Sequence, residues 1–363
     1  MLIELLADYG LFFAKVATVV IAIIIVIGAA VGMGQRGTEG PDGRLEVKKI
    51  NDRLRELADT LRAVVLDEHA YKQHQKHEKL SRKQSDKAAK KSAKKKLPVA
   101  ADSEQGEAAA PENVYVLEFD GDMKASAVER LREEITAVLT LATSKDEVVV
   151  KLESPGGLVH AYGLAASQLV RFRENNIPLT VCVDAVAASG GYMMACIANR
   201  LVAAPFAVIG SIGVVASLPN FNKVLKKYDV DYELLTAGEY KRTLTMLGEN
   251  TDAGRRKFID DLEETHTLFK DFVNEYRPSL DIARVATGET WYGQKALEQG
   301  LVDELGTSDE YLMRAAESAS VFQVKYVEKK NWQEKLGMAG QAALEKTLDS
   351  ALARALQSWN TRH

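Results

Sequence analysis

A run of small residues, AASGG at 187–191, places a single hydroxyl, that of Ser189, between a strand-like and a helix-like segment. A serine becomes a nucleophile when a base removes its proton, and neighbouring glycines let a substrate approach the backbone closely. The same run also fits a plain strand-to-helix bend, in which glycine supplies a positive φ and serine caps the helix. By itself, the run leaves both interpretations open.

A catalytic Ser189 needs a base, which can be a histidine or a neutral lysine. Four of the six histidines lie outside the α/β part of the chain, and neither His160 nor His266 belongs to a catalytic motif. The GxSxG motif of α/β-hydrolases is absent. Lys241, in TAGEYKRTLTMLG, follows a predicted strand and lies in a loop that contains Gly and Thr. A buried lysine can act as a base, whereas an ordinary surface lysine is the alternative here.

The elements that must position these residues alternate between strands and helices from Val114 onward. We expect strands at 113–123 (with a turn), 147–153, 178–184, 200–205, 212–217 and 231–235, and helices at 125–142, 160–175, after Ser189 and at 251–274, where Thr251 and Asp252 are candidate caps. This alternation is typical of an α/β domain whose largely parallel sheet is covered on both faces. Ligands of such sheets bind at the C-terminal ends of strands, where SPGG (154–157) and Ser189 both lie.

The composition adds few constraints on function. A chain of 363 residues suits about two domains, and its net charge of −4 is unremarkable. The two cysteines, Cys182 and Cys196, flank Ser189 in apolar segments, so we expect them to be small buried packing residues. Two cysteines are too few for a disulfide scaffold.

An apolar run at Leu11–Met33, interrupted only by Lys15, is long enough to cross about 30 Å of hydrocarbon as a helix. Lys15 lies near one end and can reach the interface. A cleaved signal peptide is the alternative, but the first ten residues carry Glu4 and Asp8 and no Lys or Arg. We therefore expect a retained single-span anchor at 11–34.

The segment after the anchor has a heptad-like pattern. Its apolar residues are spaced by 3, 4, 3, 4 and 3 positions: Val47, Ile50, Leu54, Leu57, Leu61 and Val64. This pattern predicts a helix that packs against another copy of the chain or against the main domain.

A basic run follows, with eleven Lys/Arg against two acids between Lys72 and Lys96. A solvated helix or a disordered tract fits it best, since the run lacks the aromatic residues and binding fold of a nucleic-acid site. Attraction to anionic lipid head groups is an intermediate interpretation so near a membrane span.

Several motifs in a fixed order resemble those of the signal-peptide peptidase A family of serine peptidases. They are SPGGL at 154–158, AASGGYMMA at 187–195, AAPFAVIGSIGV at 203–214, GEYKRT at 238–243 and ATGETWYGQKALEQGLVDELG at 286–306. Ser189 and Lys241 lie 52 positions apart (241 − 189 = 52), an interval similar to that of the family. The resemblance covers about residues 114–310.

The resemblance implies a role for five residues. Ser189 matches the nucleophile and Lys241 the general base, while Ser211, in GSIG, matches the serine that orients the lysine amine. The backbone N–H groups of Gly157 and Gly190 match the oxyanion hole, in which two fixed amides stabilise the developing charge. Neither a metal nor a cofactor is implied.

The resemblance also implies a ClpP/crotonase-like fold and a ring-like homo-oligomer, in which the Ser and Lys of one site come either from one subunit or from two neighbouring subunits. With the patterns along the rest of the chain, we expect an N-terminal flank (1–10), the anchor (11–34), a charged helical region (35–97), a linker (98–113), a ClpP/crotonase-like serine peptidase domain (114–320) and a C-terminal strand and helical tail (321–363).

We expect a single-pass protein of the bacterial inner membrane. The family resemblance puts the catalytic domain on the periplasmic side. Arg36, Arg44, Lys48 and Lys49 follow the span while acids precede it, and this charge bias puts the domain in the cytoplasm. The side of the membrane therefore stays open.

The expected function is that of a serine endopeptidase with a Ser/Lys dyad, acting through an acyl-enzyme. Its substrates would be signal-peptide remnants or other membrane-associated or misfolded peptides, bound as an extended strand, and no nucleic acid is expected. One alternative is a non-catalytic membrane scaffold on the peptidase fold. Another is a crotonase-like acyl-CoA enzyme, for which Glu153 is available but precedes the SPGG turn.

Overall fold

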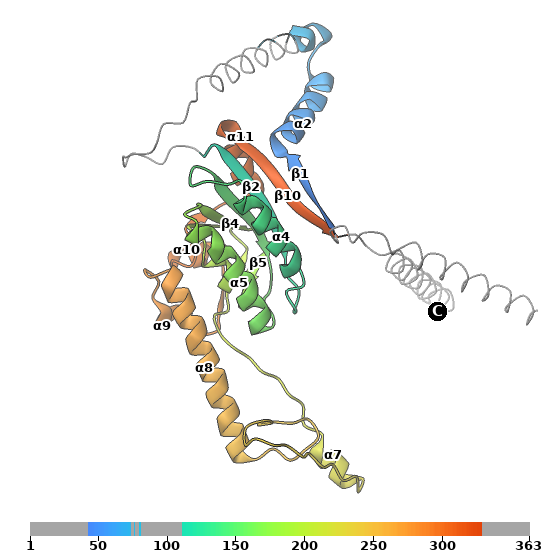
Figure 1. Cartoon of the computed structure of the whole chain (residues 1–363). Helices are drawn as coiled ribbons and strands as arrows, with labels where there is room; N and C mark the ends of the chain where they lie inside the picture. The colour runs from blue at the N-terminus through green and yellow to red at the C-terminus, as the bar shows by residue number, and fades with distance from the viewer. Residues whose placement is uncertain (1–42, 74–75, 77–79, 81–110, 329–363) are drawn as a thin grey trace, which may run out of the picture. The chain divides into compact units, whose positions relative to one another are not determined.

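The computed structural model describes residues 43–73, 76, 80 and 111–328, and Leu45–Val327 forms one compact unit (Figure 1). The anchor predicted at 11–34 lies outside the described residues, as do most of the basic run and the C-terminal tail. Within the described ranges, no helix combines the length and apolar character needed to span a membrane.

The main sheet has seven strands among the described residues, in the order β1-β10-β2-β3-β4-β6-β9. They are β1 (Gly43–Lys49), β10 (Ser320–Glu328), β2 (Asn113–Asp120), β3 (Glu147–Glu153), β4 (Leu179–Val183), β6 (Arg200–Ala203) and β9 (Glu304–Leu305). Every pairing from β10 to β9 is parallel. The predicted α/β class with a largely parallel sheet is therefore confirmed.

Side chains alternate between the two faces of this sheet, as the period of a strand requires. Val148 and Val150 of β3 enter the larger core, which α4 (Val128–Leu139) and α5 (Val159–Glu174) complete. Val149 enters the smaller core on the other face, together with Cys182 and residues of α11 (Ser308–Ser318). Both faces of the sheet are covered, as expected, and both cysteines are free and buried.

A second, three-stranded sheet carries the motif residues. It consists of β5 (Val186–Ala188), β7 (Val208–Gly210) and β8 (Thr290–Tyr292), in which β5 and β7 are parallel and β7 and β8 antiparallel. The short helices α6 (Gly190–Ala195) and α10 (Gly293–Glu298) follow β5 and β8, and α9 is Ile282–Val285. A bridge between Ser154 and Ala187 joins β5 to the end of β3, so the two sheets meet there.

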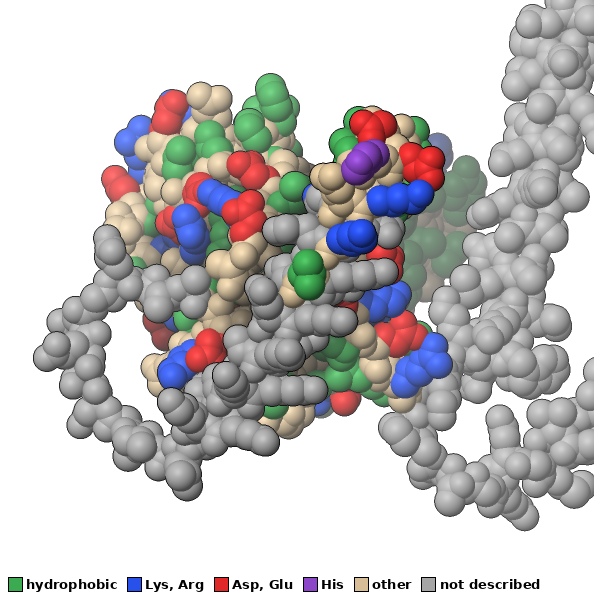
Figure 2. Space-filling model, turned by 90° about the horizontal axis from the view of Figure 1, so that it is seen from above, with side chains coloured by type: hydrophobic (Ala, Val, Ile, Leu, Met, Phe, Trp, Pro, Cys, Tyr) green, Lys and Arg blue, Asp and Glu red, His purple; other side chains and the backbone are tan. Residues whose placement is uncertain are grey.

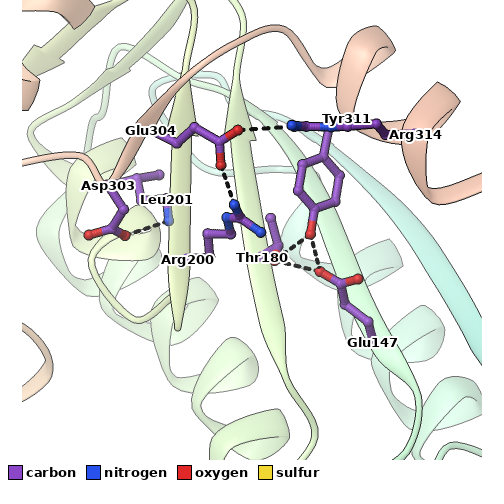
Figure 3. Close-up of polar contacts among 8 residues, drawn as sticks. All are labelled: Glu147, Thr180, Arg200, Leu201, Asp303, Glu304, Tyr311 and Arg314. Carbon is purple, nitrogen blue, oxygen red and sulfur yellow. Dashed lines mark hydrogen bonds and ion pairs between the residues drawn. The ribbon is translucent and has the colours of Figure 1, made fainter. Parts of the chain in front are cut away.

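A polar cluster joins α11 to the N-terminal ends of the central strands (Figure 3). Tyr311 and Thr180 both donate to Oε1 of Glu147, at 2.5 and 2.6 Å. Arg314 and Arg200 pair with opposite oxygens of Glu304. The face drawn in Figure 2 carries acidic and basic side chains side by side with hydrophobic ones, so its charge is mixed.

The N-terminal heptad pattern spans two elements. Its first residue, Val47, lies in β1, a strand that the pattern did not predict, and the other residues lie in α2 (Ile50–Val65). Asn51 fastens α2 to the domain by donating to Ala319 O at 2.9 Å and accepting from Val321 N–H at 2.8 Å. Ile50 packs against the smaller core, while the later heptad positions are exposed: Leu57, Leu61 and Val64.

The strands predicted at 212–217 and 231–235 are wrong. The structure has no regular strand in either segment, and β7 ends at Gly210 instead. A strand needs a neighbouring strand to satisfy its backbone groups, and neither segment pairs with a strand among the described residues. The chain there contains one short helix, α7 (Asn222–Lys227), before α8 begins.

The long helix α8 (Asp252–Tyr276) agrees with the prediction of a helix at 251–274. Thr251 is its cap, because the hydroxyl accepts from Gly254 N–H at 3.1 Å. Phe269 and Val273, near the other end, are buried in the larger core. Only the C-terminal part of α8 is thus inserted in the domain.

Candidate active site

Ser189 forms a strained turn between β5 and α6. Its backbone has φ 52° and ψ −119°, in a region that residues with a Cβ rarely adopt. Its N–H donates to Gly210 O at 2.8 Å and its C=O accepts from Met193 N–H at 3.0 Å, so the turn is held from both sides. Such strain persists where surrounding contacts enforce it, most often at functional sites.

The plain-bend interpretation of this turn is wrong in both of its parts. The positive φ belongs to Ser189 itself and not to Gly190 or Gly191. Its side chain makes no capping hydrogen bond to α6. The half-buried hydroxyl therefore has no structural role as a helix cap.

The SPGG loop lies directly against this turn. Gly156 has φ 89°, and a Cβ there would lie 2.7 Å from Ala188 O and 2.8 Å from Gly190 N. A Cβ on Gly157 would lie 2.2 Å from Met123 O. Neither position can hold a side chain without a shift of the backbone, so glycine is required at both for this close approach.

The SPGG loop also hydrogen-bonds to β5. Ser154 N–H donates to Val186 O at 2.8 Å, and Ala188 N–H donates to Ser154 O at 3.0 Å. Within the described part of the chain, the N–H groups of Gly157 and Gly190 donate to no protein acceptor. Two unused amides on loops in contact beside a serine are the donors that an oxyanion needs.

Ser211 lies in the strand-end turn next to Ser189. Gly210 pairs with Ala188 across β5 and β7, and Ser211 follows it with φ 52°. Ser211 N–H donates to Glu289 O at 2.6 Å, which fixes this second strained serine. The fold therefore brings together Ser189, Ser211 and the glycines at 157 and 190.

Lys241 lies in a different part of the unit. Its side chain is exposed, and its loop is packed against the first turn of α8, where a Cβ on Gly254 would lie 2.3 Å from Thr243 O. The helix that Ser189 begins, α6, packs against the opposite, buried end of α8. Asp252 and Phe269 are 17 positions apart (269 − 252 = 17), which corresponds to about 25 Å of helix. Within one chain, Lys241 therefore lies far from Ser189.

Neither histidine of the described α/β domain is placed as an alternative base. His160 is exposed on α5, and His266 lies on α8 with its Nε2 buried and without a hydrogen-bond partner. No hydrogen bond in the described residues joins either of them to Ser189. Across those same residues, no group of three or more His, Cys, Asp or Glu is arranged to hold a metal ion.

Sequence reasoning missed Tyr162, which lies in α5 eight positions after Ser154. Its Oη is 2.5 Å from Ser154 Oγ, and burial raises the pKa of the phenol, so it stays a donor at neutral pH. The apolar residues around it in α5 have the spacing of a buried helix face, so the sequence indicates only a core residue at Tyr162. Only the contact across the turn identifies it.

The chain was also compared with known proteins. The family model described as Peptidase family S49 N-terminal matches residues 4–169, and Peptidase family S49 matches residues 171–322. The chain is 48% identical over 340 residues to Probable protease SohB of Haemophilus influenzae, covering 93% of each.

It is 54% identical over 235 residues to Probable protease SohB of Buchnera aphidicola subsp. Acyrthosiphon pisum, covering 65% of this chain and 70% of the relative. It is 26% identical over 170 residues to Protease 4 of Haemophilus influenzae, which covers 46% of this chain and 28% of that protein.

Proposed function

This chain belongs to peptidase family S49, a membership that confirms the resemblance seen in its motifs, and we propose that it is a serine endopeptidase with Ser189 as nucleophile. The observation that carries the proposal is the strained Ser189 turn. Ser189 has a positive φ and its hydroxyl makes no capping bond, so glycine would suit a purely structural turn better than serine does. Catalysis explains why serine stands there.

In the proposed reaction, Ser189 Oγ attacks the carbonyl carbon of a peptide bond. Its proton passes to the amine of Lys241 and then to the leaving amine, which departs as the acyl-enzyme forms. Water, deprotonated by the same lysine, hydrolyses the ester and returns the proton to Ser189. The amides of Gly157 and Gly190 stabilise the oxyanion in both steps, and the hydroxyl of Ser211 orients the lysine amine.

The lysine reaches the serine from a neighbouring subunit of a homo-oligomeric ring in this proposal. Two observations support a shared site: Lys241 is exposed, and about 25 Å of α8 lies between the Lys241 loop and the end of α8 near Ser189.

Many apolar side chains between β7 and α8 are exposed in the single chain: Val215, Leu218, Phe221, Val224, Tyr228, Val230, Leu235 and Tyr240. We name this segment, 215–247, the apolar arm. Exposed apolar surface of this extent marks a protein interface.

Docking of the apolar arm on a neighbour would also bury the lysine, as a neutral amine requires. With the anchor at 11–34, the assembled sites would lie beside the bacterial inner membrane. Their substrates would be signal-peptide remnants or other membrane-associated or misfolded peptides.

The test uses the full chain purified in detergent, with casein and a fluorogenic peptide as substrates. We expect Ser189→Ala and Lys241→Ala each to lose at least about 10³-fold in kcat, and Lys223→Ala, a lysine of the same arm, to stay within about twofold. Equal activity in all variants would overturn the proposal.

Mixing the two inactive variants tests whether sites are shared. After co-refolding or subunit exchange, some interfaces pair an intact Ser189 with an intact Lys241, and about a quarter of the activity returns if subunits mix at random. Failure of the mixture to regain activity, with exchange verified by a fluorescent label, would place both residues of the dyad in one subunit.

A further inference from the structure

We propose that Tyr162 is a positioning residue that holds the oxyanion-hole loop against the nucleophile turn. Its hydroxyl joins the SPGG loop to the loop at 121–126, and its ring supports Gly190. The inference rests on the proposed peptidase function. In it, Tyr162 holds the two amide donors in position.

The hydroxyl forms the middle of a hydrogen-bond chain. Tyr162 Oη donates to the Asp122 carbonyl at 2.8 Å, and a carbonyl can only accept. The proton between Tyr162 and Ser154, at 2.5 Å, therefore comes from Ser154. Ser154 Oγ in turn accepts from Gly156 N–H at 3.1 Å. Every polar atom of this buried chain thus has a partner, and its last donor is the residue before Gly157.

The aromatic ring makes the second contact. A Cβ on Gly190 would lie 2.4 Å from Cγ of Tyr162, so the Gly190 backbone rests directly on the ring. A Cβ on Gly121 would lie 2.5 Å from both Ser154 Oγ and Tyr162 Oη, so glycine there makes room for the hydrogen bond. Tyr162 and Ser154 are both 0% exposed. One side chain therefore touches both loops that carry the proposed donors.

The loop at 121–126 is itself rigid. The Asp122 carboxylate accepts from Lys124 N–H at 3.1 Å and from Ser126 N–H at 2.8 Å. The backbone and side-chain hydrogen bonds from Ser126 hold the pKa of Asp122 below its usual value. The next residue, Met123, accepts from Leu158 N–H at 2.9 Å, directly after Gly157. Tyr162 thus links the SPGG loop to the hydrogen-bonded loop at 121–126.

This arrangement acts in the transition state more than in substrate binding. Amide donors stabilise an oxyanion when they are fixed in place before the charge develops. Loss of the Tyr162 hydroxyl leaves the Ser154 hydroxyl and the Asp122 carbonyl without their partner in a buried site. The SPGG loop then has alternative positions, and the Gly157 amide loses its preset direction.

The experiment compares Tyr162→Phe with Tyr311→Phe in the full-length enzyme. Tyr311 is the matched control, since it is buried and its hydroxyl also donates a 2.5 Å hydrogen bond, but to Glu147 at the N-terminal ends of the strands (Figure 3). The readouts are kcat and KM on a fluorogenic peptide and the inhibition constant of a peptide aldehyde, whose adduct with serine places an oxygen in the oxyanion hole.

We expect Tyr162→Phe to lower kcat by about 10- to 100-fold, to weaken aldehyde inhibition by a similar factor and to leave KM within about twofold. Tyr311→Phe should leave all three within about twofold. An equal loss in both variants, or an unchanged Tyr162→Phe enzyme, would overturn the inference.

Ser154→Ala gives an independent test that does not depend on the folding of Tyr162→Phe. It should reproduce the kcat and aldehyde effects, and the double variant should be no worse than the more severe single one, because both act through one hydrogen-bond chain. Additive losses contradict the chain. A wild-type enzyme that neither cleaves the peptide nor binds the aldehyde contradicts the proposed function, and this inference with it.

Discussion

At the scale of single residues, the backbone of the site is strained where its chemistry is proposed. Ser189 and Ser211 are two of the non-glycine residues with positive φ among those described, and they follow the paired ends of β5 and β7. A stability requirement alone favours glycine at such positions, by about 1–2 kcal/mol for a left-handed conformation. Serine at both positions agrees with the proposed chemistry, which uses both hydroxyls.

Ser189→Gly should accordingly make the protein more stable while it abolishes hydrolysis. Relief of strain at φ 52° outweighs the entropy cost of glycine, so we expect Ser189→Gly to unfold with a free energy about 1 kcal/mol above that of Ser189→Ala. Urea denaturation of the two inactive variants measures the difference. Equal stability would show that the turn is not strained.

Gly157→Ala tests the close approach of the SPGG loop. The added Cβ meets Met123 O at 2.2 Å and displaces the loop, so we expect kcat to fall by about 10²-fold or more while the far-UV circular dichroism is kept. Gly163→Ala is the control, because a Cβ there meets nothing within 4 Å on α5. That variant should keep full activity and gain up to about 1 kcal/mol in stability.

At the scale of elements, α4 is fastened to strand β10 by a buried carboxyl. Glu134 is 4% exposed and accepts from Tyr326 N–H at 2.8 Å. Burial raises the pKa of Glu134 to about 7 despite this hydrogen bond and the nearby Arg130. The carboxyl is thus favoured in its neutral form in the folded state, while the unfolded chain titrates near 4.5.

The sign of the resulting pH dependence follows from this raised pKa. Folding keeps the full contribution of Glu134 below pH 4.5 and loses it as the pH rises to about 7. We expect wild type to lose about 2–3 kcal/mol relative to Glu134→Gln between pH 4.5 and 8, as measured by urea denaturation. Glu133→Gln, at the exposed position just before, should follow the wild-type curve. Parallel curves for Glu134→Gln and wild type would contradict this account.

At the scale of the whole molecule, the apolar arm is the largest departure from a self-sufficient domain. Its backbone has no strand partner among the described residues, although two of its segments have the composition of strands. Val215 and Leu235 are 91% and 90% exposed, far above the exposure of apolar residues in the two cores. In the proposed ring, another copy of the chain would cover this arm.

Leu235→Glu should therefore weaken assembly without weakening the fold. We expect a shift toward monomers in sedimentation experiments, a loss of activity of at least about tenfold, and an unchanged unfolding midpoint of the monomer. Leu141→Glu provides the control, since Leu141 is 70% exposed but lies outside the apolar arm. A Leu235→Glu protein with wild-type mass and activity would exclude the arm as an interface.

Much of this protein was predictable from local sequence patterns. The parallel α/β class, β3, β4 and the cap of α8 follow from side-chain periodicity and capping chemistry, which act over a few neighbouring residues. The ordered motifs also indicated the peptidase family that the comparisons confirm. The dyad and the shared site remain predictions to be tested.

Other features were decided only by contacts between residues far apart in the chain. Asn51 and Val321, 270 positions apart, tie α2 to the sheet, and no local pattern encodes that bond. Likewise, strand propensity at 212–217 and 231–235 cannot form a ladder without a neighbouring strand. The sequence by itself determined which residues were available for chemistry. Tertiary structure decided that Ser189 takes a positive φ and that Tyr162 contacts both Ser154 and Gly190, because both features depend on backbone groups brought together by the two sheets.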